Sequence, residues 1–399
     1  MSTSESNYSI KYFLLLMQSV LNYTPAPKAE GKVNWQFLYE FSIKHSLSVM
    51  LYYAIEKLNE EDKPQGEFMP YLKQMHQEQI VADLNLTFEC ERMTALLSER
   101  GIRCLPVKGI VTKADYPVAY LRTMTDVDVL CDAENRLEVE EIFLQNGYEK
   151  ESVTNKDTAY RKEEILHFEM HTSLLSSESP AFDYFSKVWD RVSYKENSSI
   201  AQMSLEDIYI FMLEHLANHV LYGGAGIRMY MDVYVFLQKH QSELDKEYIN
   251  KILKDISLLS FEKQTHRICE NWFSGKEEPD VTSADYWFII NSTTFGRAKM
   301  SFLSDSLRNS KDSTAAKNGV RRIFKKLFPT VSWMKLRYRS VEKAPLLYPV
   351  FVPVHWFERL FIRRDVNTSN LSNYFVSAES DEAKALREIY VSLGLNERI

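Results

Sequence analysis

Two aspartates in the middle of the chain, Asp126 and Asp128, stand two positions apart in a segment that reads as a β-strand. In a strand every second side chain projects from the same face, so the side chains of residues 125–131 are expected to fall alternately on two faces. Both carboxylates are therefore expected on one face, where they repel each other and lose solvation on burial. A divalent cation with oxygen ligands relieves both costs, so the spacing predicts a magnesium site.

A third carboxylate, Glu169, lies in a second alternating segment. Over residues 165–171 we expect another strand, with His167, Glu169 and His171 on one face and apolar side chains on the other. Glu169 would complete a site for two metal ions about 3.5–4 Å apart, the spacing that stabilises both the attacking and the leaving oxygen in phosphoryl transfer. The three acidic residues together predict that chemistry.

The residues before the aspartates predict a turn that suits a phosphate. The apolar run 102–107 reads as a buried strand, Lys108 and Gly109 follow it, and a helix is expected over residues 110–116. The N-terminus of that helix would direct backbone N–H groups at an anion. Lys108 and Arg122 would add positive charge for phosphate oxygens or, alternatively, would be ordinary surface cations.

Taken in order, these motifs resemble those of the DNA polymerase beta-like nucleotidyltransferase superfamily, in which a glycine-containing turn, a D-x-D strand and an acidic residue on a later strand follow one another. More narrowly, the chain is similar to a poorly characterised bacterial branch. That branch is marked by K-G, R-x-x-x-D-h-D-h-L (h, apolar) and h-E-h-H, found here at residues 108–109, 122–130 and 168–171. HLANH followed by GGAGIR and an aspartate, over residues 215–232, is a further mark. The resemblance covers nearly the whole chain.

The resemblance implies a magnesium-dependent nucleotidyltransferase. It would transfer a nucleoside monophosphate from an NTP, with ATP as the expected donor, to a hydroxyl-bearing acceptor, and release pyrophosphate. Asp126, Asp128 and Glu169 would be the catalytic residues and would ligate Mg²⁺, or Mn²⁺ in its place, while Glu169 would also help to deprotonate the acceptor. The candidate nucleotide-binding residues are Lys108, Gly109, Arg122 and Arg228. Gly109 could alternatively just end a strand, and Arg228 could bind the acceptor or be a solvated arginine after a tight helix–helix turn.

The turn departs from the superfamily pattern. It usually reads Gly-Ser or Gly-Gly, and the serine hydroxyl contacts phosphate, whereas here it reads Lys108-Gly109-Ile110. The gap to Asp126 is also somewhat long. Both departures bear on how a triphosphate is held rather than on the metal site.

Histidines permit a different metal chemistry. His215 and His219 are spaced i and i+4, but no glutamate of the zinc-peptidase motif stands between them, so packing or a polar contact near the site is the favoured interpretation. The face of His167, Glu169 and His171 could also ligate a transition metal, although the aspartates upstream favour a hard cation. A hydrolase that uses zinc or manganese is the corresponding alternative function.

The remaining elements predict an α+β fold in three parts. Residues 1–100 form an N-terminal helical module, in which His45 is given a structural role. Residues 101–200 form a small mixed β-sheet, a nucleotidyltransferase-like core with helices on one face. Residues 201–399 form a C-terminal helical region, whose first helix begins with a capping-box pattern at Ser204.

Composition bounds the class of protein. The length of 399 residues suffices for two or three domains, and a formal charge of −7 argues against broad nucleic-acid binding. The four cysteines contain no C-x-x-C pair and read as reduced, mostly buried thiols. No secretory signal and no membrane-spanning run is predicted, so the cytoplasm is the expected location.

The C-terminal part carries a basic cluster followed by an aromatic run over residues 344–357. A surface for a polyanionic acceptor, an anionic lipid headgroup or a membrane is one interpretation. A basic helix face with an apolar cap on the core is the favoured one. The cluster comprises Arg321, Arg322, Lys325, Lys326, Lys335, Arg337 and Arg339.

A second hypothesis from a different class is a catalytically inactive nucleotide-binding or regulatory module on the same fold. The three intact carboxylates argue against it, because an inactive site usually loses one. The acceptor stays open, since a sugar, a small alcohol, a protein hydroxyl and a nucleic-acid end all offer the required hydroxyl.

Overall fold

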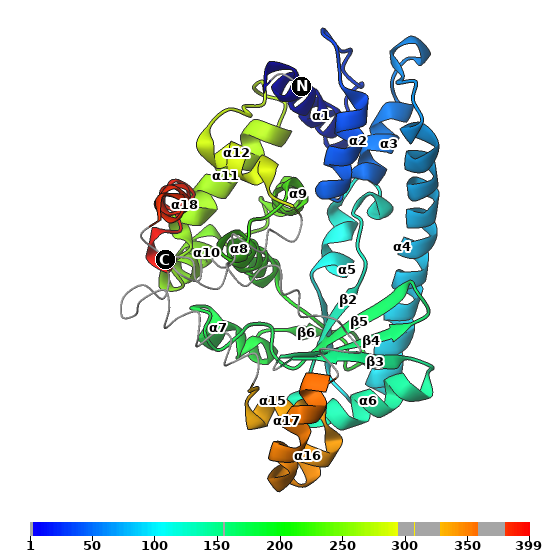
Figure 1. The fold of residues 1–399 in the computed structure, drawn as a ribbon, viewed down its shortest axis with the longest axis vertical. Helices are drawn as coiled ribbons and strands as arrows, with labels where there is room; N and C mark the ends of the chain where they lie inside the picture. Colours follow the sequence, from blue (N-terminus) through cyan, green and yellow to red (C-terminus); the bar gives the residue numbers. More distant parts are fainter. Residues whose placement is uncertain (1–2, 155, 294–306, 308–327, 358–379) are drawn as a thin grey trace.

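The structure, a computed structural model, describes residues 3–154, 156–293, 307, 328–357 and 380–399. A five-stranded sheet lies between helices from the two ends of the chain (Figure 1). This is the α+β fold predicted from the sequence. Within the described ranges, no helix combines the length and the apolar character that crossing a membrane requires.

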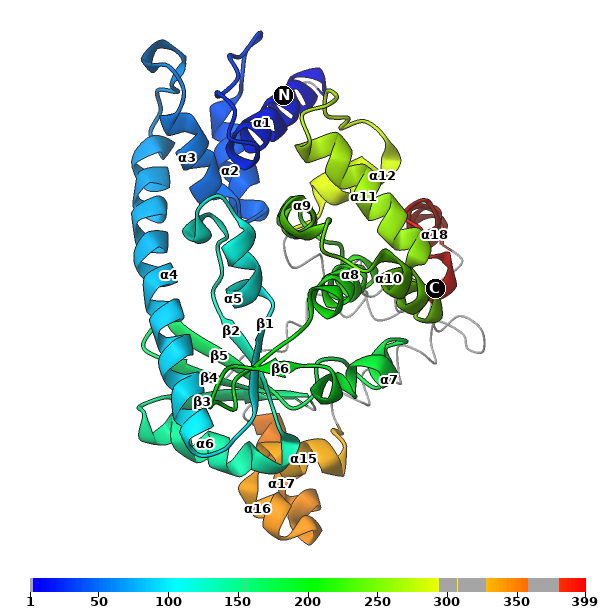
Figure 2. The same ribbon diagram turned by 180° about the vertical axis from the view of Figure 1, so that it is seen from behind.

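The N-terminal part is helical, as predicted, and its longest helix runs along the whole sheet domain (Figures 1 and 2). Asn34 begins the second helix by accepting the Phe37 N–H at 3.0 Å, which satisfies one of the N–H groups that a helix start leaves free. The elements are α1 (Thr3–Leu21), α2 (Trp35–Lys44), α3 (Ser48–Glu56), the 3₁₀ turn η1 (Glu60–Asp62) and α4 (Phe68–Glu99).

The sheet has the strand order β1-β2-β5-β4-β3, in which β2 and β5 are parallel and the other neighbours are antiparallel. The register places Asp128 of β2 beside Glu169 of β5. Two positions that are 41 residues apart in sequence thereby become lateral neighbours on one face. The strands are β1 (Cys104–Val107), β2 (Val127–Cys131), β3 (Glu149–Val153), β4 (Asp157–Lys162) and β5 (Leu166–His171).

One face of this sheet is covered by α4 and by α6 (Arg136–Gln145), which follows the 3₁₀ turn η4 (Ala133–Asn135). Val129 and Phe168 enter that core together with Met93 of α4 and Phe143 of α6. The alternation of apolar side chains in β2 and β5 therefore gives the face that the sequence predicts.

The helix after β1 is shorter than expected. The helix predicted over residues 110–116 is a single turn, α5 (Gly109–Thr112), continued by the 3₁₀ turn η2 (Lys113–Asp115). Tyr116 then turns to extended backbone because Pro117 follows it, and a residue before proline avoids the helical region. A further 3₁₀ turn, η3 (Ala119–Leu121), leads towards β2.

The C-terminal helices pack against one another on the other side of α5 from α4 (Figure 1). Ser204 begins α8 by accepting the Asp207 N–H at 3.1 Å, as its capping pattern predicts. The elements are α7 (Phe182–Phe185), η5 (Val188–Asp190), β6 (Ser193–Tyr194), β7 (Ala201–Gln202), α8 (Leu205–Tyr222), α9 (Ile227–His240), α10 (Lys246–Asp255), α11 (Leu259–Phe273), α12 (Ala284–Asn291), α18 (Asp381–Ser392) and η9 (Asn396–Arg398).

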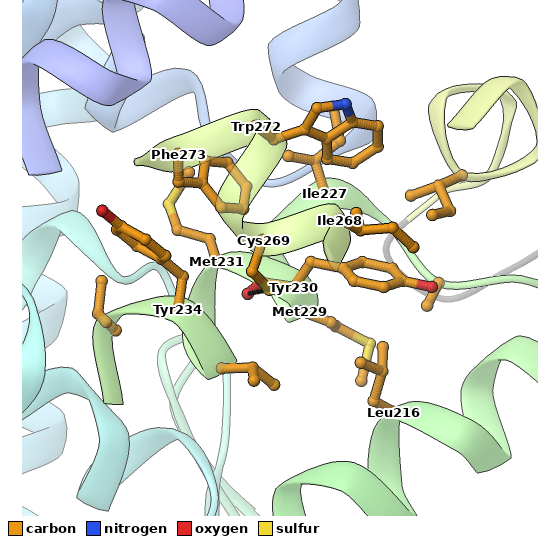
Figure 3. Packing of buried hydrophobic residues seen from close by; sticks show 14 of the residues in the cluster. Leu216, Ile227, Met229, Tyr230, Met231, Tyr234, Ile268, Cys269, Trp272 and Phe273 are labelled. Atoms are coloured by element: carbon orange, nitrogen blue, oxygen red, sulfur yellow. Dashed lines mark hydrogen bonds between the residues drawn. The ribbon is translucent and has the colours of Figure 1, made fainter. Parts of the chain in front are cut away.

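The largest apolar core joins these helices to the N-terminal ones. Trp272 and Phe273 of α11 pack with Tyr230 and Tyr234 of α9 (Figure 3), and the Gln18 side chain of α1 donates to the Trp272 carbonyl at 3.1 Å. Helices from both ends of the chain therefore stabilise each other. The boundaries at residues 100 and 200 remain predictions.

His45 has the structural role that the sequence suggests. Its Nδ1 accepts the N–H of Ile227 at the start of α9, and its Nε2 donates to the carbonyl of Ile290 in α12, both at 3.1 Å. The pKa of this imidazole is lowered to about 4, and burial is the main cause. A neutral histidine with one donor and one acceptor nitrogen thus links three distant segments.

The aromatic C-terminal run forms a small core of its own, with Met334, Val341 and Val352 buried together. Its helices are α15 (Val331–Arg337), α16 (Arg339–Lys343), η6 (Pro345–Leu347) and α17 (Tyr348–Phe357). An ion pair of 2.7 Å between Glu342 and Arg136 ties this unit to α6. The predicted cap on the main core is therefore wrong for the described residues, and Arg321, Arg322, Lys325 and Lys326 lie outside them.

Candidate active site

The three acidic residues converge at the polar face of β2 and β5. Asp126 directly precedes β2, and Asp128 lies beside Glu169 in the register of the two strands. Ligand atoms of Asp126, Glu169 and His167 lie within 4.8 Å of one another, and so do those of Asp128, Glu169 and His171. These two groups share Glu169. The donor atoms are thus close enough to surround a cation.

Lys108 reaches this cluster from a strained turn. Its φ of 57° and ψ of −127° are rare for a residue with a side chain, and they aim its ammonium group at Asp128, whose Oδ1 is 2.5 Å from Nζ. Burial acts to lower the pKa of Lys108, but the charge and hydrogen bond of Asp128, together with the charges of Glu169 and Asp126, outweigh it and the net change is upward. Lys108 therefore stays charged and neutralises part of the acidic cluster.

The carboxylates differ in their affinity for protons. Burial would raise the pKa of Asp128, but Lys108 and the His171 hydrogen bond outweigh it and hold that pKa below its usual range. Burial and then the charge of Asp128 raise the pKa of Glu169 to about 7. The same two causes raise the pKa of Asp126. Asp128 therefore stays negatively charged, whereas Glu169 takes up a proton near neutral pH.

A cavity of about 530 Å³ opens onto these groups between the sheet, α8 and α9. Ile208, Phe211 and Met212 of α8 add apolar surface to its wall. Small-molecule sites in proteins commonly combine such a lining with a few convergent polar groups. The residues that the sequence nominates for catalysis and nucleotide binding all line this cavity: Lys108, Gly109, Arg122, Asp126, Asp128, Glu169 and Arg228.

The guanidinium group of Arg122 is paired with a carboxylate inside the fold. Its Nε and Nη2 donate to the two carboxylate oxygens of Asp232 in α9 at 3.0 and 2.9 Å, and the Tyr116 hydroxyl donates to the same carboxylate at 2.6 Å. Its Nη1 lies over the Cα of Gly109, where a Cβ would collide with it. Gly109 is therefore required by packing, and the contact of Arg122 and Gly109 with phosphate remains a prediction.

Arg228 presents a cation with spare hydrogen-bonding capacity. Its Nη1 donates to the Thr123 carbonyl at 3.3 Å, while its buried Nε finds no acceptor. Burial, and then the charge of Arg122, lower the pKa of Arg228. The preceding turn is tight, because a Cβ on Gly224, at φ 99°, would collide with the side chain of Ser292. An anion in the cavity would satisfy this guanidinium.

The comparison with known proteins agrees with the motifs. A family model described as an uncharacterised nucleotidyltransferase matches residues 31–274, which include the sheet, α5, α8 and α9. The chain belongs to this family. The superfamily resemblance inferred from residues 108–171 is thereby confirmed.

One solved structure similar to this nucleotidyltransferase family member is that of an antibiotic-resistance factor, ANT(2'')-Ia, determined in solution. The two chains are 13% identical, the match covers 46% of this chain and 98% of that chain, and the TM-score is 0.34. No curated protein matches the chain.

His215 and His219 line the cavity as neutral side chains. Burial, and then the neighbouring His219, hold the pKa of His215 well below its ordinary value, and burial followed by the charge of Lys108 lowers that of His219 to about 4. Their rings meet edge to face at 4.6 Å between centroids. Within the described ranges, neither belongs to a group of three possible metal ligands.

Sequence reasoning missed several residues that support the site. Asp232 was noted only as a family mark, although it holds Arg122, and nothing local links it to Tyr116. Asp157 and Glu151, which face the two histidines of β5, were not singled out. The available signal was alternation in β4, which puts Asp157 opposite His171 once the strands are paired.

Proposed function

We propose that this protein transfers a nucleotidyl group from an NTP to a hydroxyl acceptor, in a reaction that depends on divalent cations. One observation carries the proposal: in a chain of the nucleotidyltransferase family, Asp126, Asp128 and Glu169 meet at a cavity large enough for a small molecule. ATP is the proposed donor, and the acceptor is a molecule with a free hydroxyl.

The donor atoms fit a cation, since Glu169 lies within 4.8 Å of the ligand atoms of Asp126 in one group and of Asp128 in the other. Asp126, Asp128 and Glu169 would hold Mg²⁺ or Mn²⁺. Bound there, two such ions would stabilise the charge on the attacking and leaving oxygens.

The protein's own side chains would divide the remaining work. The acceptor oxygen bonds to the α-phosphorus, the bond from that phosphorus to its bridging oxygen breaks, and pyrophosphate leaves. Glu169 would ligate a cation and help to accept the proton of the acceptor hydroxyl. Lys108 and Arg228, which both line the cavity, would bind phosphate oxygens, and Arg122 would add positive charge.

Pyrophosphate release in the presence of Mg²⁺ and each NTP, with candidate alcohols as acceptors, tests the proposal. Asp128→Asn should lower turnover at least about 100-fold, since loss of even an outer partner of a metal ligand costs 10–100-fold. Asp255→Asn, on an exposed position at the end of α10, is the matched control and should retain turnover. Thermal unfolding would show that both variants fold.

Unchanged turnover in Asp128→Asn would contradict the assignment of the site. Nucleotide binding in the wild-type protein without release of pyrophosphate, under all acceptors and cations tried, would instead favour the inactive module.

A further inference from the structure

The acidic cluster contains an imidazole at each end. His167 and His171 lie two positions before and after Glu169 on β5, so the three side chains share one face of the strand. One possible ligand group joins Asp126, Glu169 and His167, and the other joins Asp128, Glu169 and His171. Each group therefore consists of two carboxylates and one ring nitrogen, and Glu169 is common to both.

His171 is oriented as a metal ligand would be. Its side chain is 2% exposed, and its Nε2 lies 2.7 Å from Asp128 Oδ1 and 3.7 Å from Glu169 Oε2. The opposite nitrogen, Nδ1, is buried without a hydrogen bond and faces Asp157 Oδ2 at 3.7 Å. A metal-bound imidazole commonly directs its second N–H to a carboxylate, which fixes the tautomer and the ring plane. Asp157 stands where that outer carboxylate is needed.

His167 repeats the arrangement on the more open side of the cluster. Its Nε2 lies 2.9 Å from Glu151 Oε2, and Glu151 is itself held by Arg161 at 2.9 Å. Both histidines thus face a carboxylate from the antiparallel part of the sheet, Asp157 in β4 beside β5 and Glu151 in β3 beyond it. Strand pairing supplies the partner of His171, because Asp157 is its direct cross-strand neighbour.

We propose that His167 and His171 each place a ring nitrogen on a cation, in two positions bridged by Glu169, and that this centre binds a divalent transition cation in preference to Mg²⁺. Mg²⁺ prefers oxygen ligands, whereas first-row transition metals also bind imidazole nitrogen well. The inference rests on the proposed function, because it concerns the same site, and it specifies which ion the site takes.

Mn²⁺ is the probe, because it accepts carboxylate ligands and is paramagnetic. Electron spin echo envelope modulation of the full-length protein with Mn²⁺ should show coupling to imidazole ¹⁴N. Titrations followed by electron paramagnetic resonance should give a tighter dissociation constant for Mn²⁺ than the competing constant for Mg²⁺, by about tenfold or more. Neither measurement requires turnover.

His171→Gln keeps a polar side chain and should weaken Mn²⁺ binding about 10–100-fold while Mg²⁺ binding changes less. Asp157→Asn should reproduce part of this loss through the orientation of His171 and serves as the second variant should His171→Gln fail to fold. His266→Gln, on an exposed position of α11, is the matched control and should keep both constants.

The failures are distinguishable. Mn²⁺ bound without ¹⁴N coupling, or ¹⁴N coupling that persists when both His167 and His171 are replaced by Gln, would overturn the inference and leave a nucleotidyltransferase with oxygen ligands alone. Equal affinity for Mn²⁺ and Mg²⁺ would overturn it as well. Absence of both ¹⁴N coupling and pyrophosphate release under every cation would remove the proposed function together with the inference.

Discussion

The two faces of the central sheet are built from the same strands and behave in opposite ways. On one face Val129 and Phe168 pack against α4 and α6 in a dry core. On the other face Asp128, Glu169 and His171 crowd together, and the charge of Lys108 is needed to balance them. Neighbouring positions of one strand therefore serve either packing or chemistry according to which face they occupy.

The contrast teaches where this protein stores unfavourable interactions. Burial of Phe168 among aromatic rings is favourable without any ligand. Burial of Glu169 and Asp126 beside Asp128 is unfavourable without a cation, and the raised pKa values of these two carboxyl groups reflect that cost. The cation site and the apolar face that stabilises the sheet therefore lie on opposite faces of the same strands.

The largest effect is expected on the apolar face. Phe168→Ala should lower the free energy of unfolding by about 3–5 kcal/mol, because Phe168 is fully buried and the cavity would be lined by rigid strands and helices. Urea denaturation measures the change. Ile165→Ala, at a residue that is 45% exposed just before β5, should change it far less. Similar losses in the two variants would break the contrast between buried and open positions of the sheet.

The two arginines of the cavity should differ in role, because Arg122 is paired with a carboxylate and Arg228 is not. Asp232→Asn should destabilise the protein by about 3–5 kcal/mol, because it leaves the Arg122 guanidinium buried with a weaker partner. Arg228→Gln should cost little stability and should weaken nucleotide binding, because Arg228 has no carboxylate partner among the described residues. Thermal unfolding and nucleotide titration distinguish them, and a reversed pattern would show that the two arginines have each other's role.

A buried polar group outside the site should give a pH dependence of its own. The folded pKa of His45 is about 4 and its ordinary value is 6.5, so the unfolded chain takes up the proton first as the pH falls. This contribution to stability is complete above pH 6.5 and declines by up to about 3 kcal/mol between pH 6.5 and 4. Urea titrations across that range should show a shallower slope in His45→Gln, and an unchanged slope would exclude His45 as the cause.

The smallest effect concerns Lys108. Its ammonium is 2.5 Å from Asp128 Oδ1, so a cation that binds Asp128 must compete with it. Lys108→Met should therefore tighten cation binding about tenfold, equivalent to about 1.4 kcal/mol, while nucleotide binding weakens. Calorimetric titration measures both constants, and Lys263→Met on the exposed face of α11 is the control. Weaker cation binding in Lys108→Met would show that the lysine supports the site instead of occupying it.

Local regularity explains why the sheet and its acidic residues could be predicted from the chain alone. The period of two in β2 and β5 fixes which side chains share a face, and the capping residues Asn34 and Ser204 act on N–H groups three positions away. Such signals lie within a few residues, so they can be read without knowing what packs where. The helix expected over residues 110–116 is shorter in the structure, where Lys113, at the end of α5, binds the buried Asp83, a contact across 30 positions that the local pattern does not show.

Tertiary structure decided the partners. Arg122 meets Asp232 across 110 positions and His45 meets Ile290 across 245, and no spacing rule connects residues so far apart. The same holds for the environment of the site: whether a carboxylate binds a proton, a lysine or a metal depends on burial and on charges from other strands, and these exist only after the sheet has paired. Asp126, Asp128, Glu169 and the two histidines that flank Glu169 could be chosen from the sequence, but only the folded chain shows that Asp157 and Glu151 face those histidines.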